Sequence, residues 1–295
     1  SQPNSVDTSE LLKRVRKVEI KTRSLSRHIF SGEYHSAFKG RGMSFSEVRS
    51  YQYGDEVKNI DWNVTARSGD PHIKVFEEER ELTMMLLVDI SSSVHFGTRQ
   101  PWKNEWMAEL SAVLGFSALQ NNDQVGLILF TDKVEMYIPP QKGRQHLLRI
   151  IRELLYFEPV SRATDINPPL EYLTNVIKKK CIAFVMSDFI ASPYEKTLKL
   201  AAKRHDIIGM HVYDPAEAIL PDAGILKLRD PESGNFTLVD TSDENIRTLF
   251  SNRYNTHLLQ FKEQFKRAKC DTMSLATDQK YLQELHRFFK RRASA

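Results

Sequence analysis

Apolar residues recur along this chain in two alternating patterns. Short unbroken apolar runs, typical of strands buried on both faces, alternate with longer segments in which apolar residues recur at helical spacing. Strands alternating with helices of this length predict a doubly wound, mostly parallel α/β sheet with right-handed crossovers. The predicted strands are residues 82–89, 125–130, 134–138, 182–187, 207–212 and, at an edge, 274–276; the predicted helices are residues 8–27, 103–120, 145–155, 165–178, 194–203, 243–268 and 279–290.

Two segments break this alternation. Residues 28–80 have no sustained helical period and carry glycines among tyrosines and a tryptophan, so we expect short strands and tight turns there, with residues 72–76 as one strand. Residues 225–228 and 236–239 flank a Pro- and Gly-containing turn and predict a hairpin. We expect both segments to pack together. The predicted domains are a basic N-terminal helix (1–27), a small β subdomain (28–80 with 216–241), the main α/β domain (81–215) and C-terminal helices that complete it (242–295).

Composition narrows the class of protein. Of 295 residues, 41% are hydrophobic and 27% charged, as in globular proteins that do not span a membrane. The net charge of +4 comes from 42 basic and 38 acidic side chains, a near balance that gives no indication of nucleic-acid binding. The first five residues are polar and no run approaches a membrane span, so we expect a cytoplasmic protein.

Two local features have a structural and a functional interpretation. Cys181 lies in an apolar run, which indicates a buried small hydrophobe, and neither it nor Cys270 has a CxxC or histidine partner nearby.

The basic helix at residues 8–27 is typical of a solvated face over a narrow apolar stripe, and its charge also suits contact with a membrane surface or another anionic partner.

Polar oxygen side chains follow the first buried strand at alternate positions. Asp89, Ser91 and Ser93 come where that strand ends, and ligands of open α/β sheets bind outside the carboxyl ends of the strands. Alternate residues of an extended segment point the same way, so the three groups can converge on a small, hard cation. Mg²⁺ takes oxygen ligands in octahedral geometry and keeps several waters. One carboxylate and two hydroxyls would form only part of the coordination shell of Mg²⁺.

Two further strand ends supply more oxygen ligands. Thr164 lies in the loop before a predicted helix, and Asp188 follows the buried strand at residues 182–187. Together the five side chains predict a site of two carboxylates and three hydroxyls, which carries a charge of −2. Such a site would hold Mg²⁺, with Ca²⁺ or Mn²⁺ as substitutes, and would leave it able to accept a further carboxylate.

These pieces, on this fold, resemble a von Willebrand factor A domain with its metal-ion-dependent adhesion site, over residues 80–215. The resemblance implies that Asp89, Ser91, Ser93, Thr164 and Asp188 are the ligands. It also implies that the hydroxyls touch the metal, that the carboxylates often act through water, and that a partner's Glu or Asp takes the sixth position. Ser187-Asp188-Phe189 departs from the Thr-Asp-Gly frequent in that family, which leaves the backbone conformation after Asp188 open.

The segment before this domain resembles a second signature. Gly40 to Phe45, Arg49-x-Tyr51, Gly54-Asp55, Ile60 to Trp62, Ala66-Arg67 and Lys74 to Glu79 are similar to domain-of-unknown-function family fifty-eight. That resemblance implies a bacterial protein that acts as an adaptor or chaperone-like partner of a MoxR-type AAA+ ATPase and of other A-domain proteins. From the residues themselves, Arg49, Asp61 and Arg67 predict buried ion pairs or a docking surface.

Two other functions remain open at this level. A Mg²⁺-dependent hydrolase, such as a phosphatase, is possible on a similar sheet, but an aspartyl phosphatase needs a second Asp at the position of Ser91. Asp165 and His95 are the further titratable groups expected near the site. A nucleic-acid binder lacks interleaved aromatics. We therefore predict a non-enzymatic, metal-dependent protein-binding module.

Overall fold

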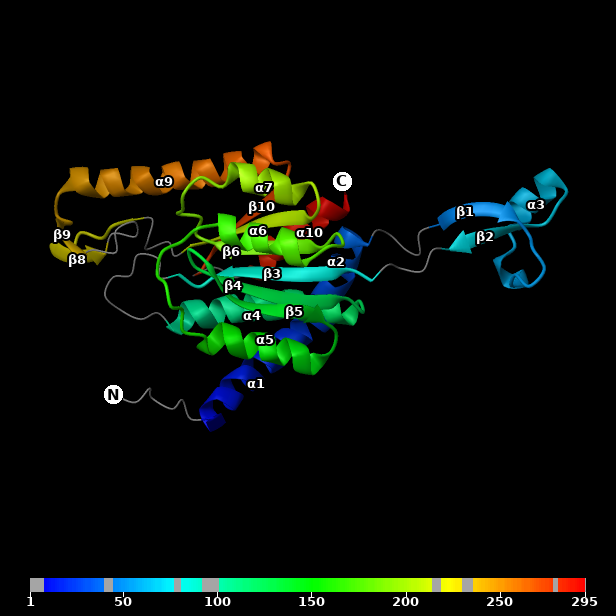
Figure 1. Ribbon diagram of the computed structural model, residues 1–295, viewed down its shortest axis with the longest axis horizontal. Helices are drawn as coiled ribbons and strands as arrows, with labels where there is room; N and C mark the ends of the chain where they lie inside the picture. Colours follow the sequence, from blue (N-terminus) through cyan, green and yellow to red (C-terminus); the bar gives the residue numbers. More distant parts are fainter. Residues whose placement is uncertain are drawn as a thin grey trace.

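The structure is a computed structural model, which describes residues 8–39, 45–76, 81–91, 101–213, 219–229, 236–277 and 281–294. A six-stranded sheet in the order β10-β7-β6-β3-β4-β5 forms its centre (Figure 1). All neighbouring pairs are parallel except β4 and β5. The predicted mostly parallel α/β fold is confirmed. The strands are β3 (Thr83–Asp89), β4 (Gln124–Phe130), β5 (Val134–Gln141), β6 (Ile182–Ser187), β7 (Asp206–Tyr213) and β10 (Asp271–Ala276).

Helices cover both faces of this sheet, which explains why its central strands are apolar throughout. In β3, Met84, Leu86 and Val88 point into one core, whereas Met85 and Leu87 point into the other. The first core is closed by α1 (Thr8–Leu25), α2 (Ser31–Phe38), α4 (Pro101–Gln120), α5 (Arg144–Tyr156) and α10 (Tyr281–Ala293). The second is closed by α6 (Asn167–Val176), α7 (Glu195–Ala202) and α9 (Glu244–Arg267).

The helical N-terminal region is longer than its sequence pattern indicated. After α1, a π-helical turn η1 (Ser26–Phe30) leads directly into α2, so the expected strands and turns from residue 28 are wrong up to residue 38. Phe30, Tyr34 and Phe38 recur every four residues and pack on the first core. Tyr34 is fully buried and its hydroxyl donates to Asp123 at 2.9 Å. Gly32, near the start of α2, hid the helical period.

The two hairpins outside the central sheet form separate two-stranded sheets, so their expected packing together is not found among the described residues. β1 and β2 precede β3 and lie toward the amino ends of the parallel strands, whereas β8 and β9 follow the carboxyl end of β7. Figure 1 shows them at opposite ends of the molecule. The elements are β1 (Phe45–Ser50), η2 (Val57–Asn59), α3 (Trp62–Ser68), β2 (His72–Phe76), β8 (Ile225–Arg229) and β9 (Phe236–Asp240).

The lobe formed by β1, η2, α3 and β2 is held by polar contacts more than by a core. Asp61 caps α3 by accepting bonds from the backbone N–H groups of Asn63 and Val64. Arg49 donates two bonds of 2.8 Å to Asp55, and the pair is half-exposed. Asp61 also forms an ion pair with Lys74 at 3.5 Å. The expected ion pairs therefore exist for Arg49 and Asp61, although the basic partner is partly exposed in each. The described residues show no ion pair for Arg67.

Candidate functional site

The candidate site begins where β3 and β6 end side by side. Val88 pairs with Met186 in the parallel register, so Asp89 lies beside Ser187 although 98 residues separate them in the chain. The Ser187 hydroxyl donates to Asp89 Oδ2 at 2.6 Å and accepts a bond from the backbone N–H of Phe189 at 3.0 Å. This contact joins the loop that follows β3 to the loop that follows β6. Ser187 was not among the predicted site residues, although its position at the end of a buried strand was the available signal.

The other carboxylate oxygen of Asp89 holds the loop that follows β3. Ser91 donates to Asp89 Oδ1 from its backbone N–H at 2.9 Å and from its hydroxyl at 2.6 Å. The Ser91 hydroxyl also lies 2.5 Å from the hydroxyl of Thr164. Thr164 therefore reaches Ser91 from a loop 73 residues further along the chain.

The Thr164 loop is fixed to the sheet by its neighbour Asp165. The Asp165 backbone N–H donates to the carbonyl of Thr131, which directly follows β4. Its carboxylate accepts bonds of 2.9 Å from the backbone and the side chain of Asn167, at the start of α6. Asp165 thus has a structural use, and His95, the other titratable group expected nearby, lies outside the described residues.

The electrostatics of the site favour a cation. Burial, together with the negative charge of Asp188, raises the pKa of Asp89 to about 7, against the opposing effect of the bonds from Ser187 and Ser91. Within the described parts of the chain, neither Asp89 nor Asp188 has a Lys, Arg or His ion-pair partner. The donors are all oxygens, the ligands that Mg²⁺ and Ca²⁺ take. These residues therefore fit a hard divalent cation.

Four of the five predicted ligands lie in the described parts of the chain. Asp89, Ser91 and Thr164 form one hydrogen-bonded cluster, and Asp188 is close enough for its charge to act on Asp89. Ser93 lies outside the described residues. Among the described residues there is no group of three or more His, Cys, Asp or Glu side chains that could bind a metal. The ligand role of the five residues stays a prediction.

The backbone after Asp188 adopts the conformation that glycine favours, although the residue is Phe189. Its φ of 56° lies in the left-handed region. The Phe189 ring is 3% exposed, stacks on Phe261 of α9 with centroids 4.3 Å apart, and meets the edge of Phe265. Burial of this ring offsets the backbone strain, which is of order 1–3 kcal/mol. Packing of Phe189 against α9 thus accounts for the backbone conformation after Asp188, which the sequence had left open.

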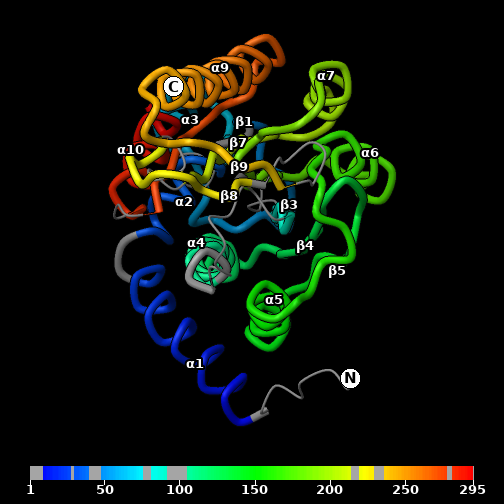
Figure 2. The backbone as a smooth tube through the Cα atoms, turned by 90° about the vertical axis from the view of Figure 1, so that its left-hand side faces the viewer, coloured from blue at the N-terminus to red at the C-terminus, as the bar shows by residue number. Residues whose placement is uncertain are grey.

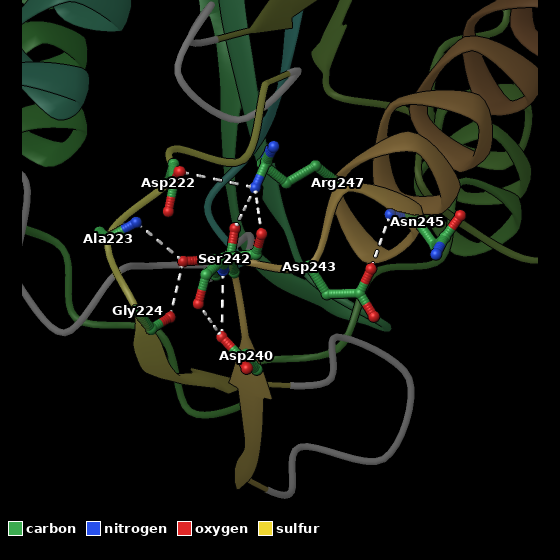
Figure 3. Close-up of polar contacts among 9 residues, drawn as sticks. Asp222, Ala223, Gly224, Asp240, Ser242, Asp243, Asn245 and Arg247 are labelled. Carbon is green, nitrogen blue, oxygen red and sulfur yellow. Dashed lines mark hydrogen bonds and ion pairs between the residues drawn. The ribbon is translucent and has the colours of Figure 1, made fainter.

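The start of α9 is bonded to the hairpin of β8 and β9. Figure 3 shows the Arg247 side chain reaching back across this junction, where it donates to the carbonyls of Thr241 and Ser242 at 2.7 and 2.9 Å. The Thr241 hydroxyl in turn donates to the carbonyl of Gly224 at 2.7 Å. Asp243 caps the helix at the N–H of Asn245. One helix therefore contacts both the hairpin and the loop that carries Asp188.

The cysteines do not offer a second reactive site. Cys181 is 2% exposed, which confirms the predicted buried position, and it is a free thiol like Cys270. The expected lack of a histidine partner is wrong for Cys181, because the fold brings Nδ1 of His205 to 3.3 Å from its Sγ atom. Burial raises the pKa of each thiol to about 12. A thiol with this pKa is protonated at neutral pH and is a poor nucleophile.

A family model described as protein of unknown function DUF58 matches residues 47–259, well over half of the chain. The chain belongs to this family. The DUF58 match begins in β1, ends in α9, and includes Asp89, Ser91, Ser93, Thr164 and Asp188. The resemblance to family fifty-eight is confirmed.

Relatives of this DUF58 chain are themselves uncharacterised. It is 27% identical over 289 residues to the uncharacterised protein Rv1480 of Mycobacterium tuberculosis, covering 96% of this chain and 90% of that protein. It is 30% identical over 122 residues to the uncharacterised protein YeaD of Bacillus subtilis, covering 40% of this chain and 28% of YeaD. The conserved hypothetical protein BatB from Bacteroides thetaiotaomicron is a structural neighbour, with a TM-score of 0.42, 16% identity, 72% of this chain and 100% of that chain covered.

The chain shows no candidate for a membrane-spanning helix: none of the helices in its described parts combines the needed length and apolarity.

Proposed function

We propose that this DUF58 protein is a non-enzymatic binding module that uses Mg²⁺, held by Asp89, Ser91, Ser93, Thr164 and Asp188, to recognise a carboxylate of a protein partner. The observation that carries the proposal is the meeting of Asp89, Ser91 and Thr164 from two distant loops. Such convergence of hydroxyls and carboxylates at the carboxyl edge of a parallel sheet is what the adhesion-site resemblance requires. Ca²⁺ or Mn²⁺ would substitute for Mg²⁺.

The chain's own residues prepare the site for this role. Asp89, with a pKa of about 7, releases its proton when a cation offsets the repulsion from Asp188. Ser187 and the backbone N–H of Ser91 hold the two oxygens of Asp89 in place. The hydroxyls of Ser91 and Thr164 lie adjacent, so both can direct a lone pair at one ion. A bound Mg²⁺ would supply a Lewis-acidic position for a carboxylate of the partner.

The partner proposed is a MoxR-type AAA+ ATPase, with other A-domain proteins as further partners, in the cytoplasm. This part rests on the family resemblance. A hydrolase has less support from the site, because Asp165 already binds Asn167 and anchors the loop instead of facing a substrate position.

Metal binding is tested first, with Mn²⁺ followed by electron paramagnetic resonance and Mg²⁺ as competitor. We expect one site, weakened at least about tenfold by Asp89→Ala and by Ser93→Ala. Asp132→Asn is the matched control, since Asp132 is an exposed carboxylate in the turn after β4. Equal binding by wild type and Asp89→Ala would contradict the metal assignment.

Partner binding is tested by capture from native lysate of the source organism with and without EDTA. We expect an AAA+ ATPase with the wild type in Mg²⁺, and its loss with EDTA or Asp89→Ala. If the same ATPase is captured in all arms, the metal is not the docking element. Metal-dependent turnover of a phosphoester, abolished by Asp89→Ala, would overturn the non-enzymatic assignment.

A further inference from the structure

The helix α1 has two apolar faces, and only one of them is covered. Val15 and Val18 are buried in the first core, 7% and 5% exposed. Leu12 and Ile20 remain 60% and 64% exposed. Leu12, Arg16 and Ile20 recur every four residues and therefore share one face of the helix. This second face is both apolar and basic, whereas the sequence pattern indicated a basic face without exposed apolar side chains.

The second face of α1 forms one wall of a groove of about 840 Å³. Arg144 and Leu148 of α5 line the other side, and Figure 2 shows α1 running beside α5. An adjoining hollow of about 700 Å³ shares Arg23, Arg27 and Arg144 with it and extends to the loop between β5 and α5. The two form one depression, which we call the α1–α5 groove, and it reaches the amino edge of the sheet, away from the candidate metal site.

Positive charge dominates the α1–α5 groove. Glu19 is the one acid among the lining residues of the larger hollow; it is 6% exposed and is held by a two-point ion pair from Arg144. Arg23 approaches Glu19 only to 3.9 Å. For Arg16 and Arg27, the described parts of the chain contain no carboxylate partner. These guanidinium groups therefore keep their donors for a ligand.

Two further features add to this field. Asp123 lines the second hollow, but its charge is offset by Lys39 at 2.8 Å, and both side chains are buried. The helix α5 begins after Gly143 without a side-chain cap, so its first N–H groups and the helix dipole are directed at the same hollow. An anionic ligand would be attracted along the whole depression.

We propose that the α1–α5 groove binds an acidic, amphipathic helix of a protein partner. Apolar side chains of that helix would lie against Leu12, Ile20 and Leu148, and its acidic side chains would pair with Arg16, Arg23 and Arg27. This surface is separate from the candidate metal site and goes beyond the proposed function.

Shape and lining decide between anionic ligands. A bilayer surface is flat and contacts convex features, whereas these apolar side chains lie along a concave groove between two helices. A nucleic acid would require aromatic side chains for stacking or a fully polar floor, but the apolar lining is aliphatic along α1. A helix laid into a groove satisfies the charge and the apolar area together.

The probe for the test is a synthetic helix of about five turns with leucines on one face and glutamates on the other, labelled for fluorescence anisotropy. We expect Arg23→Ala combined with Arg27→Ala to weaken its binding by about tenfold or more, and Leu12→Ser combined with Ile20→Ser by a similar factor. Lys13→Ala combined with Lys17→Ala removes the same charge from exposed positions of α1 outside the groove. This control should change binding less than about twofold. All substitutions are at exposed positions, and circular dichroism verifies folding.

Three comparisons complete the test. A peptide of the same composition in scrambled order and one with lysine in place of glutamate should both bind at least about tenfold more weakly. Equal binding of the scrambled peptide, or equal loss in the lysine control, would overturn the proposal. Vesicles containing phosphatidylglycerol, or duplex DNA, would also overturn it if they bound more tightly than the acidic helix and lost affinity in the Arg23 and Arg27 variant. Mg²⁺ and EDTA should make no difference, which separates this surface from the metal site.

Discussion

Replacement of Asp89 by Asn provides a direct test of the electrostatics at the candidate site. Asn has the same shape, so its side-chain oxygen still accepts the bonds from Ser91, and its amide faces Ser187, whose hydroxyl can rotate to accept a bond. The substitution therefore removes a charge and leaves the contacts. We expect the metal-free Asp89→Asn variant to be more stable than the wild type above pH 5.

The size of the effect follows from the pKa of Asp89, which burial and Asp188 raise from 3.8 to about 7. Below about pH 3, folded and unfolded chains both hold the proton and the group costs nothing. Between pH 4 and 7 only the unfolded chain ionises, so the wild type loses about 1.4 kcal/mol of stability per pH unit as pH rises. Above pH 7 both ionise and the loss levels off. The cost is about 1–2 kcal/mol at pH 5 and about 4–5 kcal/mol at pH 8.

The assay is urea unfolding in EDTA at several pH values from 4.5 to 8.5. The difference in unfolding free energy between Asp89→Asn and wild type should grow by about 3 kcal/mol from pH 5 to pH 8. Asp132→Asn, which alters an exposed carboxylate at the same edge, should show no such growth. Mg²⁺ at about one hundred times its dissociation constant should stabilise only the wild type, by about 2.7 kcal/mol. A pH-independent difference between the two proteins would refute the reasoning.

Three substitutions elsewhere, one of them with a glycine control, test a buried ion pair, core packing and a helix cap, each by urea unfolding. Asp123→Ala leaves the buried Lys39 charge without its partner and should cost about 3–5 kcal/mol; a loss below about 1 kcal/mol would contradict a buried pair. Gly209→Ala places a methyl group 2.5 Å from Phe265 and should cost about 1–3 kcal/mol, whereas Gly32→Ala, with nothing within 4 Å, should cost nothing. Asp61→Ala removes a helix cap and should cost about 1 kcal/mol, with faster amide exchange confined to the lobe around α3.

Local pattern was sufficient to predict most elements of the sheet and the side chains at its edge. The run from Ile182 to Ser187 is apolar because helices cover both faces, and the predicted bounds of β6 agree with the structure. Asp89 and Asp188 were found for the same reason, since each is the first charged residue after a buried run. The helix at residues 31–38 was missed because its apolar spacing rests mainly on Tyr34 and Phe38, with Phe30 just before it, and because it includes a glycine.

What the sequence determined by itself is therefore local: which segments are apolar on both faces, and which oxygen side chains follow them. Only the tertiary structure decided that β3 lies between β6 and β4, which brings Ser187 to Asp89 and Thr164 to Ser91. It also decided that the two hairpins stay apart and that an arginine-lined groove opens beside α1. The physical reason is that periodicity reports the environment of one element, whereas strand order and grooves depend on contacts between segments far apart in the chain.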